Sequence, residues 1–447
     1  MKRLMLIVLF CSLVGLATQA QEIKNNDTEI RKTEKQEFVA PDSVITKSEY
    51  ANPKKGLSFG PIPAVAFDAD KGFEYGAILN IYNFGDGSKY PNPISSWYIE
   101  AAAYTRGSQQ YILSYDKKDI FPGTRLCASA NVVYDKALPF YGFNGYEAIY
   151  DQEKDKKGGF YRMTRLTPNF KVDLIGEITD NLYWEAGYHF TYFKTSLFES
   201  EDANSQSLLN LYNKWGIIPD SQMNGGVSSA IRFGAMYDSR DVENSPSRGI
   251  WAEAHAIVAP SFLGTTHPYN KINATFRHYI PIASDKLVFA YRLNYQGFIG
   301  NAPWYVLPYY TIVGPNYDRT GIGGYRTVRG LKANRVQGAH TGFFNTELRW
   351  RFVDFTLFNQ NISLALSGFF DGAKVIKGIE NSNKTGAFAD EYSKYIQQIG
   401  YDKLHMSAGA GFRFIMNRNF IVALEYARCL DAQDGSGAFY INTGFLF

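Results

Sequence analysis

The chain is short of cysteine and, beyond its first residues, of long apolar runs. Of its three cysteines, Cys11 lies in an N-terminal apolar segment, which leaves Cys127 and Cys429 as isolated residues. Two such cysteines give no sign of a disulfide framework. Past residue 20, no apolar run reaches the ~18 residues that mark a membrane-spanning helix. The sequence therefore excludes a helical membrane protein.

Signals of catalysis are also missing. There is no G-x-S-x-G nucleophile elbow. The Gly-rich residues 321–324 are not followed by Lys and Ser or Thr at the spacing of a phosphate-binding loop. Six histidines are scattered without the spacing of metal ligands. We expect no enzyme activity, no metal, no cofactor and no nucleic-acid partner.

Aromatic residues and glycine are abundant instead. The chain has 32 Tyr, 33 Phe and 40 Gly, with a formal charge of +3 and a mean hydropathy of -0.25. Transmembrane barrels have this kind of composition, because their strands alternate apolar and polar residues and average to mild polarity. The composition favours an all-β protein of the bacterial cell outer membrane.

The N-terminus carries the pattern of an export signal. Lys2 and Arg3 precede an apolar run, and small residues end at Ala20 before Gln21. Residues 1–20 are therefore predicted to be a signal peptide. Residues 21–56 are polar and charged, so they cannot bury enough apolar surface to fold alone. We expect a short, disordered periplasmic tail there, followed by an outer-membrane β-barrel over residues 57–447.

Sixteen candidate strands follow the tail, which predicts a 16-stranded antiparallel transmembrane β-barrel with a long loop folded into the lumen. They lie near residues 58–68, 73–83, 94–106, 108–118, 123–136, 159–177, 181–197, 227–239, 249–260, 269–281, 286–300, 342–353, 360–372, 403–416, 419–430 and 438–447.

The lengths of the connections support this count. The four longest gaps, 137–158, 198–226, 301–341 and 373–402, all follow odd-numbered strands. Gaps after even-numbered strands are mostly short turns. A chain whose tail starts in the periplasm would then place every long loop outside the cell, as outer-membrane barrels require.

One strand shows the expected two faces clearly. Between residues 343 and 352, Leu348 and Trp350 fall on one face, while Glu347 and Arg349 fall on the other, because strand side chains alternate with period two. A half-buried strand of a soluble sandwich would also alternate. The charged face, the export signal and the loop parity favour a barrel with lipid outside and a wet lumen inside.

The last predicted strand, 438–447, ends on an aromatic residue. Its alternation places five residues on the face that we expect to contact lipid: Phe439, Ile441, Thr443, Phe445 and Phe447. This ending resembles the signal by which the outer-membrane assembly machinery recognises a barrel. Any lipid-facing strand at a C-terminus would look similar.

Several short motifs, taken in order, resemble the BamA/TamA superfamily, also called the bacterial surface-antigen family. They are Val328-Arg329-Gly330-Leu331, Asn345-Thr346-Glu347-Leu348-Arg349, Phe369-Phe370-Asp371-Gly372, and Tyr237-Asp238-Ser239-Arg240-Asp241 followed by Pro246 and Gly249. The resemblance covers the whole barrel from about residue 57 to residue 447.

The resemblance implies that a loop arginine pairs with acidic residues of the inner wall. Here that residue is Arg329, facing Glu347 and Asp371, and the strand alternation independently places both carboxylates toward the lumen. Two carboxylates and one guanidinium can hold a loop through charge-assisted hydrogen bonds. Gly330 would permit the tight backbone path. The alternative is a solvated loop arginine; neither reading makes the residue catalytic.

The resemblance also implies a role in outer-membrane biogenesis, or in insertion or export of proteins or lipids, which includes the role of an accessory subunit. Expected partners are outer-membrane lipid, the assembly machinery, and client or partner outer-membrane proteins. Family members usually carry periplasmic POTRA repeats, and residues 21–55 are too few for one, so we expect a barrel without them.

A weak seam between the first and last strands is the mechanism that the family suggests. Pro61 and Pro63 lie in the first strand and each lacks a backbone N–H, so ladder hydrogen bonds should be lost there. The prolines favour a gate, or they merely blunt one end of the strand. The alternative function is a passive pore or a purely structural barrel.

Overall fold

A computed structural model describes this protein over residues 55–447. Within that range, the residues not described are 69–70, 89–92, 157–158, 200–205, 244, 312–320, 358–359, 381–385, 398 and 417–419. The predicted signal peptide and nearly all of the predicted tail lie outside the described residues.

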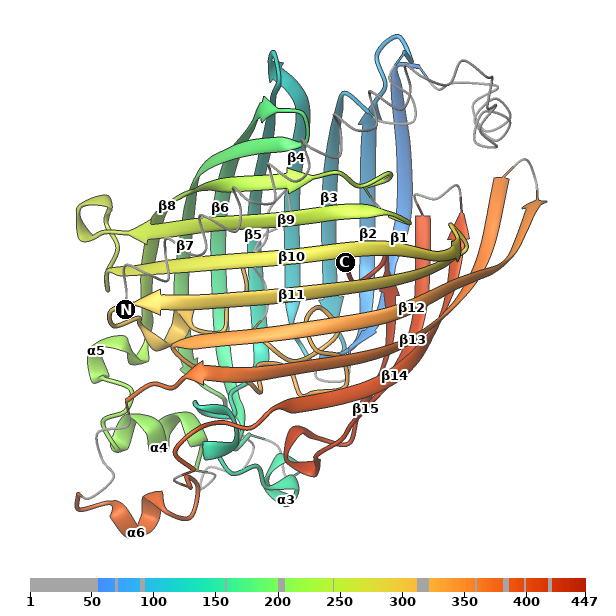
Figure 1. Ribbon diagram of the computed structural model, residues 1–447. Helices are drawn as coiled ribbons and strands as arrows, with labels where there is room; N and C mark the ends of the chain where they lie inside the picture. The colour runs from blue at the N-terminus through green and yellow to red at the C-terminus, as the bar shows by residue number, and fades with distance from the viewer. Residues whose placement is uncertain are drawn as a thin grey trace, which may run out of the picture. The chain divides into compact units, whose positions relative to one another are not determined.

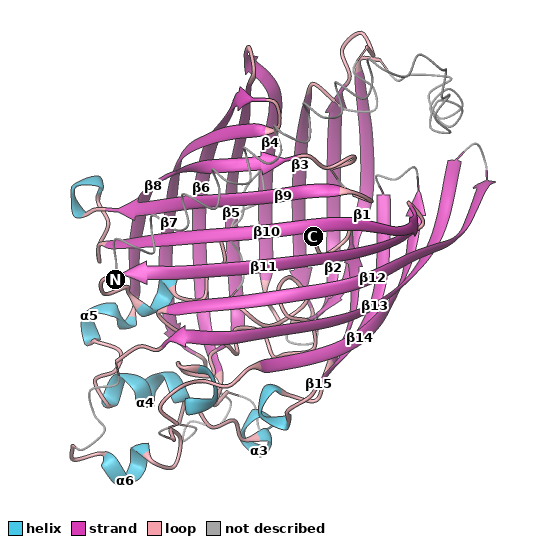
Figure 2. Cartoon of the chain, in the orientation of Figure 1, coloured by secondary structure: helices cyan, strands magenta, loops and turns pink. Residues whose placement is uncertain are grey.

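The described chain is an antiparallel β-barrel of sixteen strands that closes by pairing β1 with β16 (Figures 1 and 2). The strands are β1 Leu57–Asp68, β2 Gly72–Asn83, β3 Ser95–Tyr104, β4 Gln109–Phe121, β5 Thr124–Pro139, β6 Arg162–Thr179, β7 Leu182–Leu197, β8 Gly225–Asp238, β9 Gly249–Ala259, β10 Tyr269–Ser284, β11 Leu287–Ile299, β12 His340–Leu357, β13 Gln360–Lys377, β14 His405–Met416, β15 Phe420–Cys429 and β16 Ala438–Thr443. The predicted fold class and strand order are confirmed.

Short helices occupy the connections that follow odd-numbered strands. They are η1 Gly145–Glu147, α3 Gln152–Lys156, α4 Leu208–Lys214, α5 Asp220–Met223, η2 Ser261–Leu263, η3 Trp304–Val306, α6 Ala389–Tyr392 and η4 Ala432–Asp434. We call this end of the barrel, at the lower left of Figure 1, the long-loop end and the opposite end the short-turn end.

No helix among the described residues is both long enough and apolar enough to cross a membrane.

The strands present an apolar outer face and a polar inner face. On β12, Leu348 and Trp350 are 45% and 52% exposed, whereas the alternating Asn345, Glu347 and Arg349 are at most 5% exposed. Exposed aromatics outside and charges inside are the arrangement that a barrel in a lipid bilayer requires. The alternation predicted for this strand is therefore confirmed.

An aromatic core closes the long-loop end. Four connections, those after β5, β7, β11 and β13, bring their side chains into one buried cluster, which we call the cap. At its centre Tyr212 and Trp215 are fully buried, and Phe140 contacts Phe143, Tyr212 and Trp304 edge to face. Such edge-to-face pairs add to the free energy gained by burial.

The prediction for the last strand is wrong at its end. β16 stops at Thr443, Gly444 adopts a φ of +86°, and the chain then turns into the lumen. Phe447 is 8% exposed and packs against Tyr279 on β10 and its neighbours on β11 rather than facing lipid. In Figure 1 the C-terminus accordingly lies within the ring of strands.

Hydrogen-bond direction explains why β16 ends early. The carbonyl of Phe73 on β2 accepts from the N–H of Thr105, just after β3, so odd-numbered β2 residues bond toward β3 and even-numbered ones toward β1. Through the β1–β2 register, odd-numbered β1 residues then direct their N–H and C=O groups toward β16, which agrees with the pairing of Phe67 with Ile441. Continuing that register would set residue 63 opposite 445 and residue 61 opposite 447.

Both of those β1 positions are proline. Pro61 and Pro63 cannot donate to the carbonyls that a longer β16 would present, so the ladder would lose two hydrogen bonds there. Residues 445 and 447 therefore gain little by extending the strand, and Gly444 permits the turn inward.

Candidate functional site

Arg329 lies in the lumen, on the long connection between β11 and β12, residues 300–339, which we call loop six. Its Nε and Nη2 atoms donate to the two carboxylate oxygens of Asp371 at 2.8 and 3.0 Å, and its backbone N–H donates to the same carboxylate at 3.1 Å. Paired donors on one planar group give a bidentate contact with fixed geometry. The sequence-predicted pairing of Arg329 with β13 is present in the structure.

Two more carboxylates meet the same guanidinium. Nη1 of Arg329 donates to Glu347 on β12 at 2.5 Å and to Glu425 on β15 at 2.9 Å. The guanidinium also stacks on Phe369, 3.5 Å from the ring centroid. Burial alone would lower the pKa of Arg329, but the three carboxylates raise it well above its ordinary value, so the side chain stays charged.

Two wall arginines balance the carboxylates. Arg349 donates to Glu347 at 2.6 Å, and Arg413 donates to Glu425 at 2.7 Å. We call the six residues the lumen charge network: Arg329, Arg349, Arg413, Glu347, Asp371 and Glu425. Three cations face three anions, and every side chain of the network is nearly or fully buried. Buried charges of this kind are tolerated only when each is paired.

Gly330 is required by both conformation and space. Its φ is +88°, where a side chain is strained, and a Cβ atom there would lie 3.1 Å from Ala427 and 3.3 Å from Ser407. Its N–H donates to the hydroxyl of Tyr440 on β16 at 3.0 Å. The hydroxyl of Ser407 donates to the carbonyl of Arg329. Loop six is thus bound to the wall through its backbone as well as its charges.

The second half of loop six is anchored at the long-loop end. Arg335 donates to the carbonyls of Gly145 and Ala148 at 2.9 and 3.1 Å. Nearby, His405 lies between two carboxylates, with Nδ1 2.6 Å from Asp434 and Nε2 3.2 Å from Asp402. Arg335 thus joins loop six to the connection after β5, and His405, at the start of β14, joins the connections after β13 and β15.

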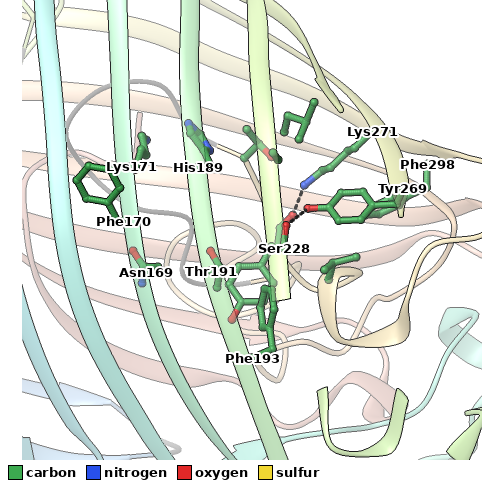
Figure 3. Close-up of a pocket in the computed structure, with 15 residues that line it drawn as sticks. Asn169, Phe170, Lys171, His189, Thr191, Phe193, Ser228, Tyr269, Lys271 and Phe298 are labelled. Carbon is green, nitrogen blue, oxygen red and sulfur yellow. Dashed lines mark hydrogen bonds between the residues drawn. The ribbon is translucent and has the colours of Figure 1, made fainter. Parts of the chain in front are cut away.

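A cavity of about 60 Å³ remains between loop six and the wall of β6–β11 (Figure 3). Its lining is mixed. Phe193 and Phe298 are apolar, Lys171, His189 and Lys271 are basic, and the hydroxyls of Ser228 and Tyr269 are hydrogen-bonded to each other at 2.8 Å. A space this size holds only a few water molecules. It is not a channel for solutes.

The C-terminal segment, residues 444–447, contacts the lumen charge network from the other side. Nη2 of Arg349 donates to the carbonyl of Phe447 at 2.9 Å. The guanidinium groups of Arg349 and Arg413 lie 4.4 and 4.8 Å from the ring centroid of Phe445. Of the four predicted signal residues, only Phe439 and Ile441 remain on β16, and Phe439 is 45% exposed on the outer face.

Sequence reasoning found half of this network. It identified Arg329, Glu347 and Asp371, with the adjoining Gly330, which the structure brings together, and it missed Glu425 and the roles of Arg349 and Arg413. The signal was available, because Glu425 lies between Leu424 and Tyr426, both exposed on the outer face, so alternation places it inward. That these contacts lock loop six in place stays a prediction.

The seam is the weakest junction of the barrel wall. Among the described residues, β1 and β16 pair at one position, Phe67 with Ile441, whereas β1 and β2 pair at twelve. β16 has six residues against twelve in β1. The part of β1 toward the short-turn end, Leu57 to Ala66, therefore has no β16 residue paired with it.

Comparisons with known proteins agree with this architecture. The Omp85 superfamily domain matches residues 97–447. A search of the curated proteins gives no match.

Two solved structures show the same fold. BamA from Haemophilus ducreyi lacking POTRA domains 1–3 is 17% identical, with a TM-score of 0.54, over 87% of this chain and 70% of that chain. CdiB from Escherichia coli is 10% identical, with a TM-score of 0.54, over 88% of this chain and 63% of that chain. At these identities the likeness concerns the fold alone.

Proposed function

Since the chain belongs to the Omp85 superfamily, we propose that it resides in the bacterial outer membrane and acts there in membrane biogenesis, inserting or exporting proteins or lipids through its seam. The long-loop end would face outward and the short-turn end the periplasm. The role is non-catalytic, and the barrel works with outer-membrane lipid and with client or partner outer-membrane proteins.

The single seam pair is the observation that carries this proposal. Separating β1 from β16 breaks the one or two hydrogen bonds of that pair, on the order of 1–3 kcal/mol. Separating β1 from β2 would break a twelve-position ladder. A barrel that opens sideways would therefore open at this seam and leave its other junctions intact.

The filled lumen supports lateral opening over axial passage. The cap covers the long-loop end, and the lumen charge network holds loop six inside the barrel. A passive pore requires a continuous aqueous path. The cavity of about 60 Å³ between loop six and the wall does not supply one.

A disulfide across the seam tests the proposal. Phe67→Cys with Ile441→Cys joins residues that face each other in the ladder, at a separation that a disulfide spans. The matched control, Phe67→Cys with Phe73→Cys, joins β1 to β2, which already pair throughout. The two cysteines of the described barrel, Cys127 and Cys429, are buried, so an oxidant reaches the introduced pair first.

The measurement is the rate at which an unfolded outer-membrane barrel folds into liposomes that contain the purified protein. We expect the wild type and the control to accelerate folding, and the oxidised seam variant to do so only after reduction. Full acceleration by the oxidised seam variant would reject the gate. No acceleration by the wild type, with or without solute leakage, would favour a passive pore or a structural barrel.

A further inference from the structure

The open edge of β1 has more hydrogen-bond acceptors than donors. Odd-numbered β1 residues direct their backbone groups toward the seam, as the β1–β2 register and the pairing of Phe67 show. From Phe59 to Pro63 this edge presents three carbonyls, those of Phe59, Pro61 and Pro63. The only N–H group in that stretch belongs to Phe59, because proline has none.

A protein strand is a poor occupant of such an edge. A strand that adds to a sheet needs N–H and C=O partners in alternation. Opposite Pro61 and Pro63 its carbonyls would find no donor, and within a bilayer no water replaces the missing partner. Natural edge strands carry proline for this reason, since it prevents pairing with another strand.

We propose that the open part of the seam binds a lipid with a primary ammonium headgroup, rather than the backbone of a client strand. The three carbonyls lie parallel along the edge, about 7 Å apart, and each can accept a hydrogen bond from an N–H donor of an ammonium. This inference rests on the proposed function of the seam, and it makes lipid the substrate class.

The surroundings of the edge suit a lipid. Leu57 and Phe59 are each 62% exposed on the outer face, where acyl chains lie. The carbonyls belong to the first seven residues of β1, Leu57 to Pro63, at the short-turn end. Because a spanning strand needs about ten residues and β1 has twelve, Phe59 lies near the headgroups of one leaflet and Pro63 lies deeper in the apolar layer.

The first test compares two lipids that differ in donors alone. The purified full chain is placed in nanodiscs of equal phosphatidylethanolamine and phosphatidylcholine with identical acyl chains, extracted, and analysed by native mass spectrometry for retained lipid. Choline carries no N–H. We expect the ethanolamine lipid to be retained about two- to tenfold over the choline lipid, which is the range that one net hydrogen bond contributes. Equal retention by the wild type would overturn the inference.

The prolines supply the matched variants. Pro61→Ala with Pro63→Ala restores both N–H donors, so the edge can pair with residues 445 and 447. The ratio of retained ethanolamine lipid to retained choline lipid should then fall toward one. Pro281→Ala, on β10 away from the seam, should leave the preference unchanged. An undiminished preference in the double variant would show that the retained lipid binds elsewhere, which also rejects the site.

Crosslinking separates the two substrate classes. A photoreactive residue at position 59, irradiated while an unfolded client barrel is folding in the same liposomes, should capture lipid. Capture of the client as the main product would replace this inference with strand addition and leave the proposed gate standing. If the wild type prefers the ethanolamine lipid but the seam disulfide does not change the rate of client folding, the gate is rejected and the lipid site remains.

Discussion

Removing the Arg329 side chain should loosen loop six. Arg329→Ala deletes four side-chain hydrogen bonds to Asp371, Glu347 and Glu425, together with the stacking on Phe369. Three carboxylates would then face only two arginines in a buried site. Breaking a buried, hydrogen-bonded ion pair by removing one partner typically costs about 3–5 kcal/mol, because the remaining charge has lost its counter-ion.

Two measurements report this loss. The temperature at which the folded barrel converts to the unfolded form on a semi-native gel should fall, and a protease should cleave the variant between residues 321 and 340. Arg326→Ala is the matched control. That arginine lies on the same loop, is partly exposed and donates to Tyr325, outside the network, so its removal should leave both measurements near wild type.

A graded series sharpens the result. Arg329→Lys keeps the charge but cannot form the bidentate contact, so it should fall between wild type and Arg329→Ala. Glu347→Arg should be more harmful than Glu347→Gln, because it places a fourth cation beside Arg349. Unchanged heat resistance and unchanged protease protection in Arg329→Ala would refute the idea that the network holds loop six.

Three other variants test separate contacts. Gly330→Ala should reduce the free energy of unfolding by about 1–3 kcal/mol, because of the left-handed φ and the close approach to Ala427, and so lower heat resistance on the gel. Wild-type heat resistance would show that the backbone relaxes there. Trp215→Ala should cost about 3–5 kcal/mol and open the cap to protease, and continued resistance would mean that the cap is not one core. Deleting Phe447 should reduce the amount of heat-modifiable barrel in the membrane more than deleting one residue of the tail within 21–55, and equal amounts would reject the assembly-signal hypothesis.

The strands were predictable because their signal is local. Alternation with period two and short turns after even-numbered strands set β12 and its neighbours to within a few residues. Inward placement of Glu347 and Asp371 followed from the same alternation. Which inward charges meet across the lumen did not follow, because Arg329 reaches β15 as well as β12 and β13, and that depends on how loop six enters the closed barrel.

The end of β16 was not predictable from its own residues. Residues 444–447 continue the alternation of a strand, and the turn inward depends on their register against Pro61 and Pro63, almost four hundred positions earlier. Local patterns cannot fix a register between the two ends of a chain. From the sequence, each proline indicates only an edge strand. The pairing of Phe67 with Ile441 shows that the prolines lie where a longer β16 would need N–H donors.

The cap determines where this barrel would accept a foreign peptide. Because four connections share one buried core, an epitope tag inserted into any of them would displace aromatic side chains that the other three need. The connection after β9 differs: Phe262 at its tip is 83% exposed, and Gly264 has open space around it. Exposed loop tips tolerate insertion best. Labels and affinity handles for this protein therefore belong between Ser261 and Gly264, where they leave the packed loops undisturbed.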